Sequence, residues 1–285
     1  EVREDHYGAA RARYEAALPL FQAIPDRLGE ANTLRALGDL ERMEDHYGAA
    51  RARYEAALTL YQAIPSRLGE ANTLRAQGNL AGALDQDEAA LQLLEVAADA
   101  YRTLGLRLAE ASCYNDMAAV MSGLERHAEA LGYYDRAIAL SPAAMFFRNR
   151  ADTLIELERF DEAALALDAA ESRQPDQPYA FLHRGRIALW TNQPAEAVRL
   201  VEAAVALRPL LNIFHYWLAY ALLAAGAVEH ALAELEQALE LTYVRKELME
   251  MEDELARLGR AYGPLPGLDR LADRLRRALA ESAAS

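Results

Sequence analysis

The sequence predicts an all-α solenoid, in which pairs of helices stack side by side. Two observations carry this prediction. Residues 4–43 and 44–83 match each other at 32 of 40 positions, and a unit this short cannot bury its apolar face without a neighbouring unit. Within each unit, apolar and small residues recur at i, i+3, i+4 and i+7, which is the period of a helix and not the two-residue period of a strand.

Each unit is expected to form two helices. The first helix is predicted over residues 27–42 and the second over 45–63, with Ser66 as an N-cap for the next unit. Residues 4–24 match the second helix of a unit whose first helix is missing, so we expect a bare stacking face there, and further repeats or an effector domain upstream. Pro19 is expected to kink or shorten this helix.

Small residues extend the period beyond the two similar units. An anchor in each first helix is followed by small residues 12 and 19 positions later, because the helices approach closely there and a leucine would overpack them. A bulky residue follows the anchor by 16 positions. Pro142, Pro175 and Pro209 are expected to end second helices. The six sets are Gly38, Ala50 and Ala57; Gly78, Ala90 and Ala97; Ala118, Ala130 and Ala137; Ala151, Ala163 and Ala170; Gly185, Ala197 and Ala204; and Ala219, Ala231 and Ala238.

This succession of small, bulky, small and proline positions over residues 27–243 resembles a tetratricopeptide repeat (TPR) array. The first anchors are 40 residues apart, similar to the longer repeats of Pins/LGN-type spindle-polarity adaptors, kinesin light chains and the sensor arms of bacterial signal-transduction ATPases. The later anchors, 33 or 34 residues apart, resemble the standard short repeat. The resemblance implies a right-handed superhelix of helix-turn-helix units whose inner wall takes ligands.

Four parts of the chain are therefore expected: an incomplete repeat at 1–24, two 40-residue units at 25–105, four further units at 106–243, and a C-terminal helix with its capping helix at 244–285. The last part is expected to begin with a helix over 244–261 and to continue through a Gly/Pro break at 263–267. It ends with an amphipathic helix over 268–282 whose charged face caps the solenoid.

In the family that the sequence resembles, the inner-facing residues lie 6 and 3 positions before the anchor and 1 and 4 after it. In the first half of the chain these positions carry amides and guanidiniums, which suit an extended peptide. Asp116 stands where the carboxylate clamp of chaperone-binding repeats requires an amide, so a chaperone C-terminus is not expected. That Asn and Arg merely solvate a helix face after a recent duplication remains an alternative. The predicted peptide-binding residues are Asn32, Arg35, Asp39, Asn72, Arg75, Asn79, Asn115, Arg148 and Arg186.

The same register gives the second half an apolar strip, which would be unusual in water. The strip consists of Tyr179, Leu182, Leu189, Tyr216, Tyr220 and Leu223. Three alternatives could cover it: a bound partner helix, a second copy of the chain, or the chain's own last helices.

Residues 209–228 carry no formal charge and could just cross a bilayer. The repeat anchors stay in register through this segment, so no membrane contact is expected.

Composition and motifs argue against several function classes. The formal net charge of -14 repels phosphate backbones, so nucleic acid is not expected as a partner. The single cysteine, Cys113, excludes an intrachain disulfide and favours the cytoplasm, and we expect it to pack in the core. No phosphate-binding glycine loop, HExxH or GxSxG motif occurs. The acidic residues Glu247, Glu250, Glu252, Asp253 and Glu254 are interpreted as a solvated helix face.

We therefore expect a non-enzymatic scaffold, with no metal or cofactor, that binds a protein or peptide segment in its concave groove. The resemblance suggests the partner-sensing part of a larger bacterial signalling or regulatory protein. The alternative is a self-associating module that forms a homodimer or larger homo-oligomer through the apolar strip.

Overall fold

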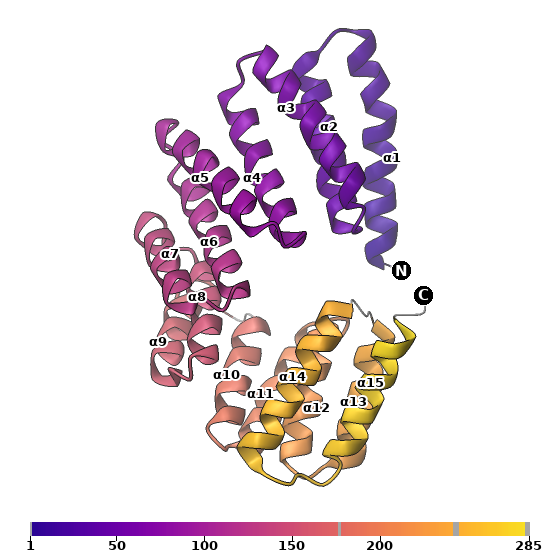
Figure 1. Cartoon of the computed structure of the whole chain (residues 1–285), viewed down its shortest axis with the longest axis vertical. Helices are drawn as coiled ribbons and strands as arrows, with labels where there is room; N and C mark the ends of the chain where they lie inside the picture. Colours follow the sequence, from indigo (N-terminus) through magenta and orange to yellow (C-terminus); the bar gives the residue numbers. More distant parts are fainter. Residues whose placement is uncertain (1, 176–177, 242–244, 283–285) are drawn as a thin grey trace. The chain divides into compact units, whose positions relative to one another are not determined.

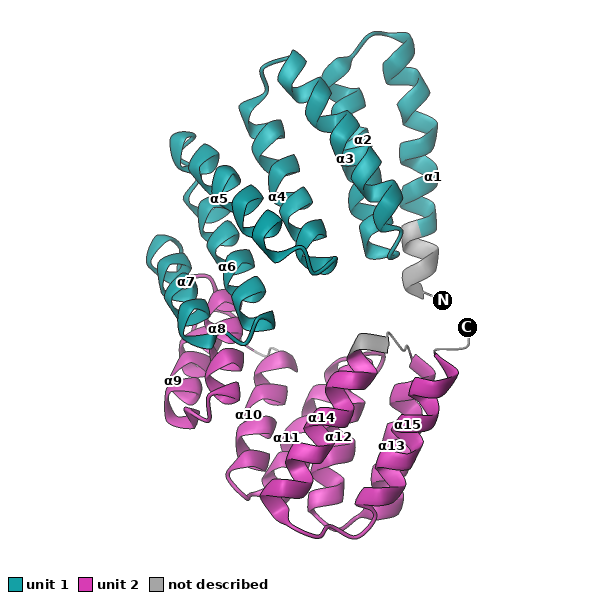
Figure 2. Cartoon of the chain, in the orientation of Figure 1, with its two compact units in different colours: residues 1–142 teal, residues 143–285 magenta. Residues whose placement is uncertain are grey.

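The computed structural model describes residues 2–175, 178–241 and 245–282, and in these ranges it contains fifteen helices and no strand. The all-α class is confirmed. The chain divides into two units, residues 1–142 and residues 143–285 (Figure 2).

Unit 1 consists of a single helix followed by three helix pairs (Figure 1). Its helices are α1 (Val2–Ala23), α2 (Arg27–Met43), α3 (Tyr47–Ala63), α4 (Arg67–Ala83), α5 (Asp87–Thr103), α6 (Arg107–Gly123) and α7 (His127–Leu140). The pairs are α2–α3, α4–α5 and α6–α7, and the second helices α3 and α5 also pack on the first helix of the next pair. Asp26 caps α2 by accepting a hydrogen bond from the N–H of Gly29 at 2.9 Å, whereas Ser66, at the equivalent place before α4, makes no such bond.

Unit 2 consists of four helix pairs; α9 and α11 pack on the next first helix, whereas α14 contacts α12 and α15 contacts α13. Its helices are α8 (Ala144–Glu156), α9 (Phe160–Glu171), α10 (Pro178–Trp190), α11 (Pro194–Leu207), α12 (Asn212–Ala224), α13 (Val228–Leu241), α14 (Arg245–Tyr262) and α15 (Leu268–Glu281). The two C-terminal helices lie where the sequence predicts them, while the expected boundary between residues 243 and 244 lies outside the described residues. Within the part of the chain that is described, no helix is both long and apolar enough to cross a membrane.

Small residues lie where the helices touch, as their spacing predicts. All the alanines at anchor and partner positions are at most 1% exposed. A Cβ added to the anchor Gly38 would lie 2.7 Å from the ring of Tyr54, and one added to Gly185 would lie 2.5 Å from Cγ2 of Val201. Both distances are well below van der Waals contact, so the packing of each helix pair requires glycine at these anchors.

The turns inside the six helix pairs that carry a repeat anchor share one backbone geometry. Seven positions after each anchor stands a residue with φ between 54° and 82°, and the N–H of the following residue bonds the carbonyl five positions before it at 2.8–2.9 Å. This is the Schellman arrangement, in which a left-handed residue lets the chain reverse after a helix. The turn residues are Asp45, Asp85, Glu125, Glu158, Asn192 and Gly226.

α1 repeats the sequence of α3 but packs on one side only. Its Tyr14 is 37% exposed, whereas the equivalent Tyr54 is fully buried between α2 and its neighbours. The expected bare face is therefore present on this helix. The expected shortening of α1 at Pro19 is not observed: the helix continues to Ala23, the equivalent of the last residue of α3.

Candidate functional site

The predicted groove residues of unit 1 lie on its first helices, α2, α4 and α6, which contact one another in succession. Six of these seven side chains are partly or fully accessible. Asn115 is the exception, since it is only 6% exposed. The seven residues are Asn32, Arg35 and Asp39 on α2, Asn72, Arg75 and Asn79 on α4, and Asn115 on α6.

Buried tyrosines of the second helices hold two of the amides in place. The hydroxyl of Tyr61 donates to Oδ1 of Asn32 at 2.6 Å, and the hydroxyl of Tyr101 donates to Oδ1 of Asn72 at 2.6 Å. Both tyrosines are 1% exposed, so the same contact recurs in two successive units. Each bond uses one of the two lone pairs of the amide oxygen and fixes the orientation of the amide, whose N–H groups and second lone pair remain suited to a ligand.

Both arginines among the predicted groove residues of unit 1 are paired with a carboxylate. Nη1 of Arg35 lies 2.9 Å from Oδ2 of Asp39, and Nε of Arg75 lies 2.6 Å from Oδ2 of Asp116. Burial opposes the charge of Arg75, but the hydrogen bond and the charge of Asp116 outweigh it and raise the pKa of Arg75. Asp116, which departs from the chaperone-binding pattern in the sequence, therefore serves as the partner of this guanidinium.

In unit 2, α14 covers the predicted apolar strip. Five of its six side chains are at most 3% exposed, and only Tyr179, at 40%, is exposed. The five belong to one core that includes Leu248 and Leu255 of α14, and the hydroxyl of Tyr220 donates to the carbonyl of Met251 at 2.7 Å. Of the three covers that the sequence left open, the chain's own last helices are the one observed.

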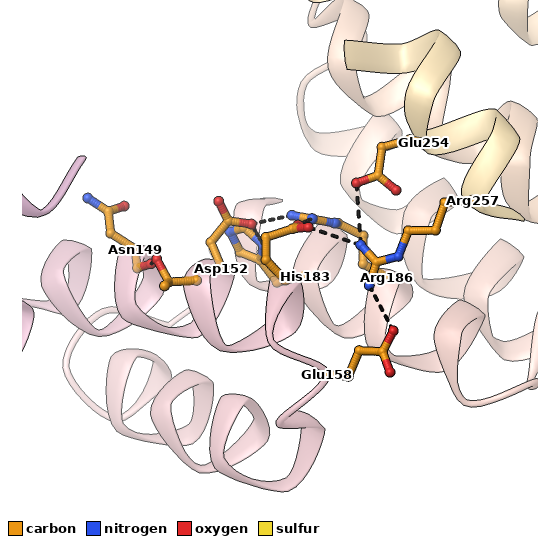
Figure 3. A network of polar contacts seen from close by, with 9 residues as sticks. Asn149, Asp152, Glu158, His183, Arg186, Glu254 and Arg257 are labelled. Atoms are coloured by element: carbon orange, nitrogen blue, oxygen red, sulfur yellow. Dashed lines mark hydrogen bonds and ion pairs between the residues drawn. The ribbon is translucent and has the colours of Figure 1, made fainter. Parts of the chain in front are cut away.

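The second half of α14 is held by polar contacts as well (Figure 3). The guanidinium of Arg257 lies 3.0 Å from Oε2 of Glu156 on α8 and 4.5 Å from the ring centroid of Trp190 on α10. The hydroxyl of Tyr262 donates to the carbonyl of Leu189 at 2.5 Å. α14 is thus bound to α8, α10 and α12 together.

A cavity of about 550 Å³ lies between α8, α10, α12 and α14. Arg186 lines it and is 7% exposed. Its guanidinium pairs with Asp152 and Glu156 and lies 4.5 Å from the ring centroid of Trp217. Arg148, the other groove residue predicted in this unit, lies on α8 with its guanidinium 5.9 Å from the ring of Tyr179 at the cavity edge.

Glu254 contradicts the interpretation of the acidic residues of α14 as a solvated face. Its side chain is 22% exposed, and its Oε2 atom is buried with no hydrogen-bond partner among the described residues. Burial, followed by the charge of Glu156, raises the pKa of Glu254, although Arg186 and Arg257 oppose this. The acidic spacing along α14 could not reveal this, because it does not say which helix lies opposite.

We expect the substitution Glu254→Gln to stabilise the fold at pH 7.5. The raised pKa means that the ionised carboxylate is less favourable in the folded chain than in the unfolded chain, where the value is near 4.5. The gain should therefore shrink as the pH falls through the folded pKa and vanish below pH 4.5. Urea denaturation at pH 7.5 and pH 4 tests this, with the exposed Glu240→Gln as the control, and a loss of stability at pH 7.5 would contradict it.

Cys113 is a core residue, as expected. Its side chain is fully buried, and burial raises the pKa of its thiol to about 12. The thiol is therefore protonated at neutral pH and is no nucleophile.

Comparisons with known proteins agree with this architecture. One tetratricopeptide repeat family model matches residues 3–63, and another matches residues 122–178, 148–192 and 182–242. These matches together include more than half of the chain. No curated protein matches the sequence.

Three solved structures show the same fold at low sequence identity. The Rap conjugation gene regulator of plasmid pLS20, in complex with the Phr* peptide, has a TM-score of 0.69 at 18% identity, over 90% of this chain and 75% of that one. A tetratricopeptide repeat protein from Parabacteroides merdae has a TM-score of 0.55 at 14% identity, over 86% and 98%. A thermophilic TPR protein of Thermus thermophilus has 0.54 at 20%, over 66% and 98%. With six helix pairs built on the repeat anchors and with these matches, the chain belongs to the tetratricopeptide repeat family.

Proposed function

We propose that this chain is a non-enzymatic scaffold that binds an extended protein or peptide segment across the first helices of unit 1. The observation that carries the proposal is the row of polar side chains on α2 and α4. Asn32 and Asn72 are fixed by identical tyrosine contacts 40 residues apart in the sequence, so their donors recur at one repeat spacing. A row of fixed donors suits the carbonyls of an extended backbone and costs little ordering on binding.

The family supports this proposal, because repeat solenoids offer extended surfaces for binding. The Rap structure contains a peptide, which favours a peptide as the ligand class for this chain also. We further propose that the chain acts in a bacterial signalling or regulatory protein in the cytoplasm, as the resemblance of its longer repeats suggests.

Self-association through the apolar strip is less well supported. Five of the six strip residues are buried beneath α14, so a second copy could reach them only after α14 had left. The remaining residue, Tyr179, offers too little apolar area for a stable dimer.

The proposal is tested with peptides selected from a phage-displayed random dodecapeptide library against the whole chain. We expect Arg35→Gln combined with Arg75→Gln to weaken the selected peptides at least tenfold in calorimetric titration, because the two guanidiniums lose their charge. Glutamine is preferable to glutamate here: a glutamate at position 75 would face Asp116, which lies 2.6 Å from the present guanidinium, and would destabilise the unit.

The matched control is Arg51→Gln combined with Arg107→Gln, which removes two exposed charges from the same unit and should leave the affinity unchanged. A library that yields no binder, or peptides that bind both double variants as tightly as the original chain, would overturn the proposal.

A further inference from the structure

We propose that the cavity between α8, α10, α12 and α14 holds a basic side chain of a bound polypeptide. This inference rests on the proposed function and concerns a polypeptide contact within unit 2. Three properties of the cavity carry it: its charge, its unpartnered polar atoms and its aromatic walls.

The cavity has more negative than positive charge. Its lining contains five carboxylates and one guanidinium, that of Arg186. Two more guanidiniums lie at the edge: Arg257 contacts Glu156, and Arg148 lies beside Tyr179. His183 contributes no charge at neutral pH, because burial lowers its pKa to about 4. Five carboxylates therefore face three guanidiniums among the described lining and edge residues, so the cavity is negative and a cationic ligand is favoured. The five are Asp152, Glu156, Glu250, Asp253 and Glu254.

Buried polar atoms of the lining have no hydrogen-bond partner among the described residues. They include the hydroxyl of Tyr216, Nδ1 of His183 and Oε2 of Glu254. Tyr216 is 1% exposed and His183 is 8% exposed, and Nδ1 of His183 lies 3.6 Å from Asp152, beyond hydrogen-bonding distance. All three atoms can accept a hydrogen bond, so a ligand group rich in N–H donors would satisfy them. The unpartnered Nε of Arg186 could donate to a carbonyl of the same polypeptide.

The aromatic walls of the cavity favour an organic cation over a metal ion as the ligand. Tyr179, Tyr216, Trp217 and Tyr220 line the cavity, and aromatic faces attract guanidinium and ammonium groups. Trp217 already holds one guanidinium at 4.5 Å. No group of His, Cys, Asp or Glu in the described ranges is arranged to hold a metal. A volume of about 550 Å³ suits a long side chain with its adjoining backbone.

The test uses the whole chain and a capped single residue, N-acetyl-arginine N-methylamide. Trp217 lies in the cavity wall and is one of only two tryptophans, so its fluorescence reports on occupancy. At constant ionic strength we expect a saturable change with a Kd of about 1 mM, which is typical of a weak single-site contact. The citrulline analogue, which has nearly the same shape without the charge, should bind at least tenfold more weakly. The lysine analogue tells whether a guanidinium or any ammonium is preferred.

A pair of double variants separates the cavity from general charge. Glu250→Gln with Asp253→Asn removes two exposed carboxylates from the cavity rim and should weaken the arginine compound at least fivefold. Glu202→Gln with Glu240→Gln removes two exposed carboxylates from α11 and α13 and should change nothing. Equal binding of arginine and citrulline, equal loss in both variants, or no binding up to 20 mM (about twentyfold above the expected Kd) would overturn the inference. Peptide selection on unit 1 is unaffected by any of these results, so a failure of this inference can be distinguished from a failure of the proposed function.

Discussion

Replacing Tyr220 with alanine should destabilise the protein by about 3–5 kcal/mol, the cost of truncating a large buried aromatic residue. Tyr220 is 1% exposed, packs edge-on against Trp217 at 5.6 Å between centroids, and donates its hydroxyl to Met251 of α14. The truncation removes the ring that α14 covers and the bond that ties α14 to α12. Urea denaturation followed by tryptophan fluorescence measures the loss.

Two controls make this result specific. Tyr220→Phe keeps the ring and removes only the hydrogen bond, so we expect a loss of about 1 kcal/mol. Leu210→Ala removes an apolar side chain that is 71% exposed, and it should change stability by less than about 0.5 kcal/mol. If Tyr220→Ala cost no more than Leu210→Ala, the strip would be open to a partner, and α14 would not be its cover.

The same added methyl group should have opposite effects at two helical glycines. Gly185→Ala places a Cβ 2.5 Å from Cγ2 of Val201, a stiff β-branched side chain that is 1% exposed, and 3.4 Å from the carbonyl of Ala197. We expect a loss of about 2 kcal/mol from overpacking. Gly132→Ala lies in the middle of α7, with nothing within 4 Å of the added Cβ, and should gain about 1 kcal/mol of helix propensity.

The melting temperatures of the two variants test both expectations, since each kcal/mol of stability shifts the melting temperature by a few degrees. Gly185→Ala should melt lower than the original chain and Gly132→Ala higher. A Gly185→Ala protein as stable as the original would mean that α10 and α11 are not in close contact at the anchor, and the repeat spacing would then have another cause.

The fold could be predicted because each unit repeats the same local constraints. Gly38, Gly78 and Gly185 mark places where a side chain cannot fit, and Pro142, Pro175 and Pro209 follow the ends of three second helices, α7, α9 and α11. These steric requirements act between residues that are close in the sequence. One unit therefore shows them, and the next unit shows the same pattern again. The cover of the apolar strip could not be predicted in this way. The spacing of Leu248, Met251 and Leu255 shows that α14 has an apolar face, but any apolar surface would satisfy it.

The polar sites were predicted only in part. The repeat register placed Asn32 and Asn72 on one row, but it gave no sign that Tyr61 and Tyr101, from the adjacent helices, would fix them. It also hid Glu254, because an acidic helix face has the same spacing whether it meets water or Arg186. Long-range pairs of this kind depend on the packing of helices that are far apart in sequence, and a single sequence carries no record of that packing.

The contacts of α14 change how unit 2 is expected to unfold. In a simple repeat array each pair touches only its neighbours, so helices can melt stepwise from an end. Here Arg257 reaches Glu156 across 101 residues and Tyr262 reaches Leu189 across 73. Contacts of such high sequence separation slow folding and couple distant helices into one cooperative block. In the described part of unit 1 the main helix contacts join neighbouring helices or successive pairs, so we expect this unit to keep the graded melting of an ordinary array.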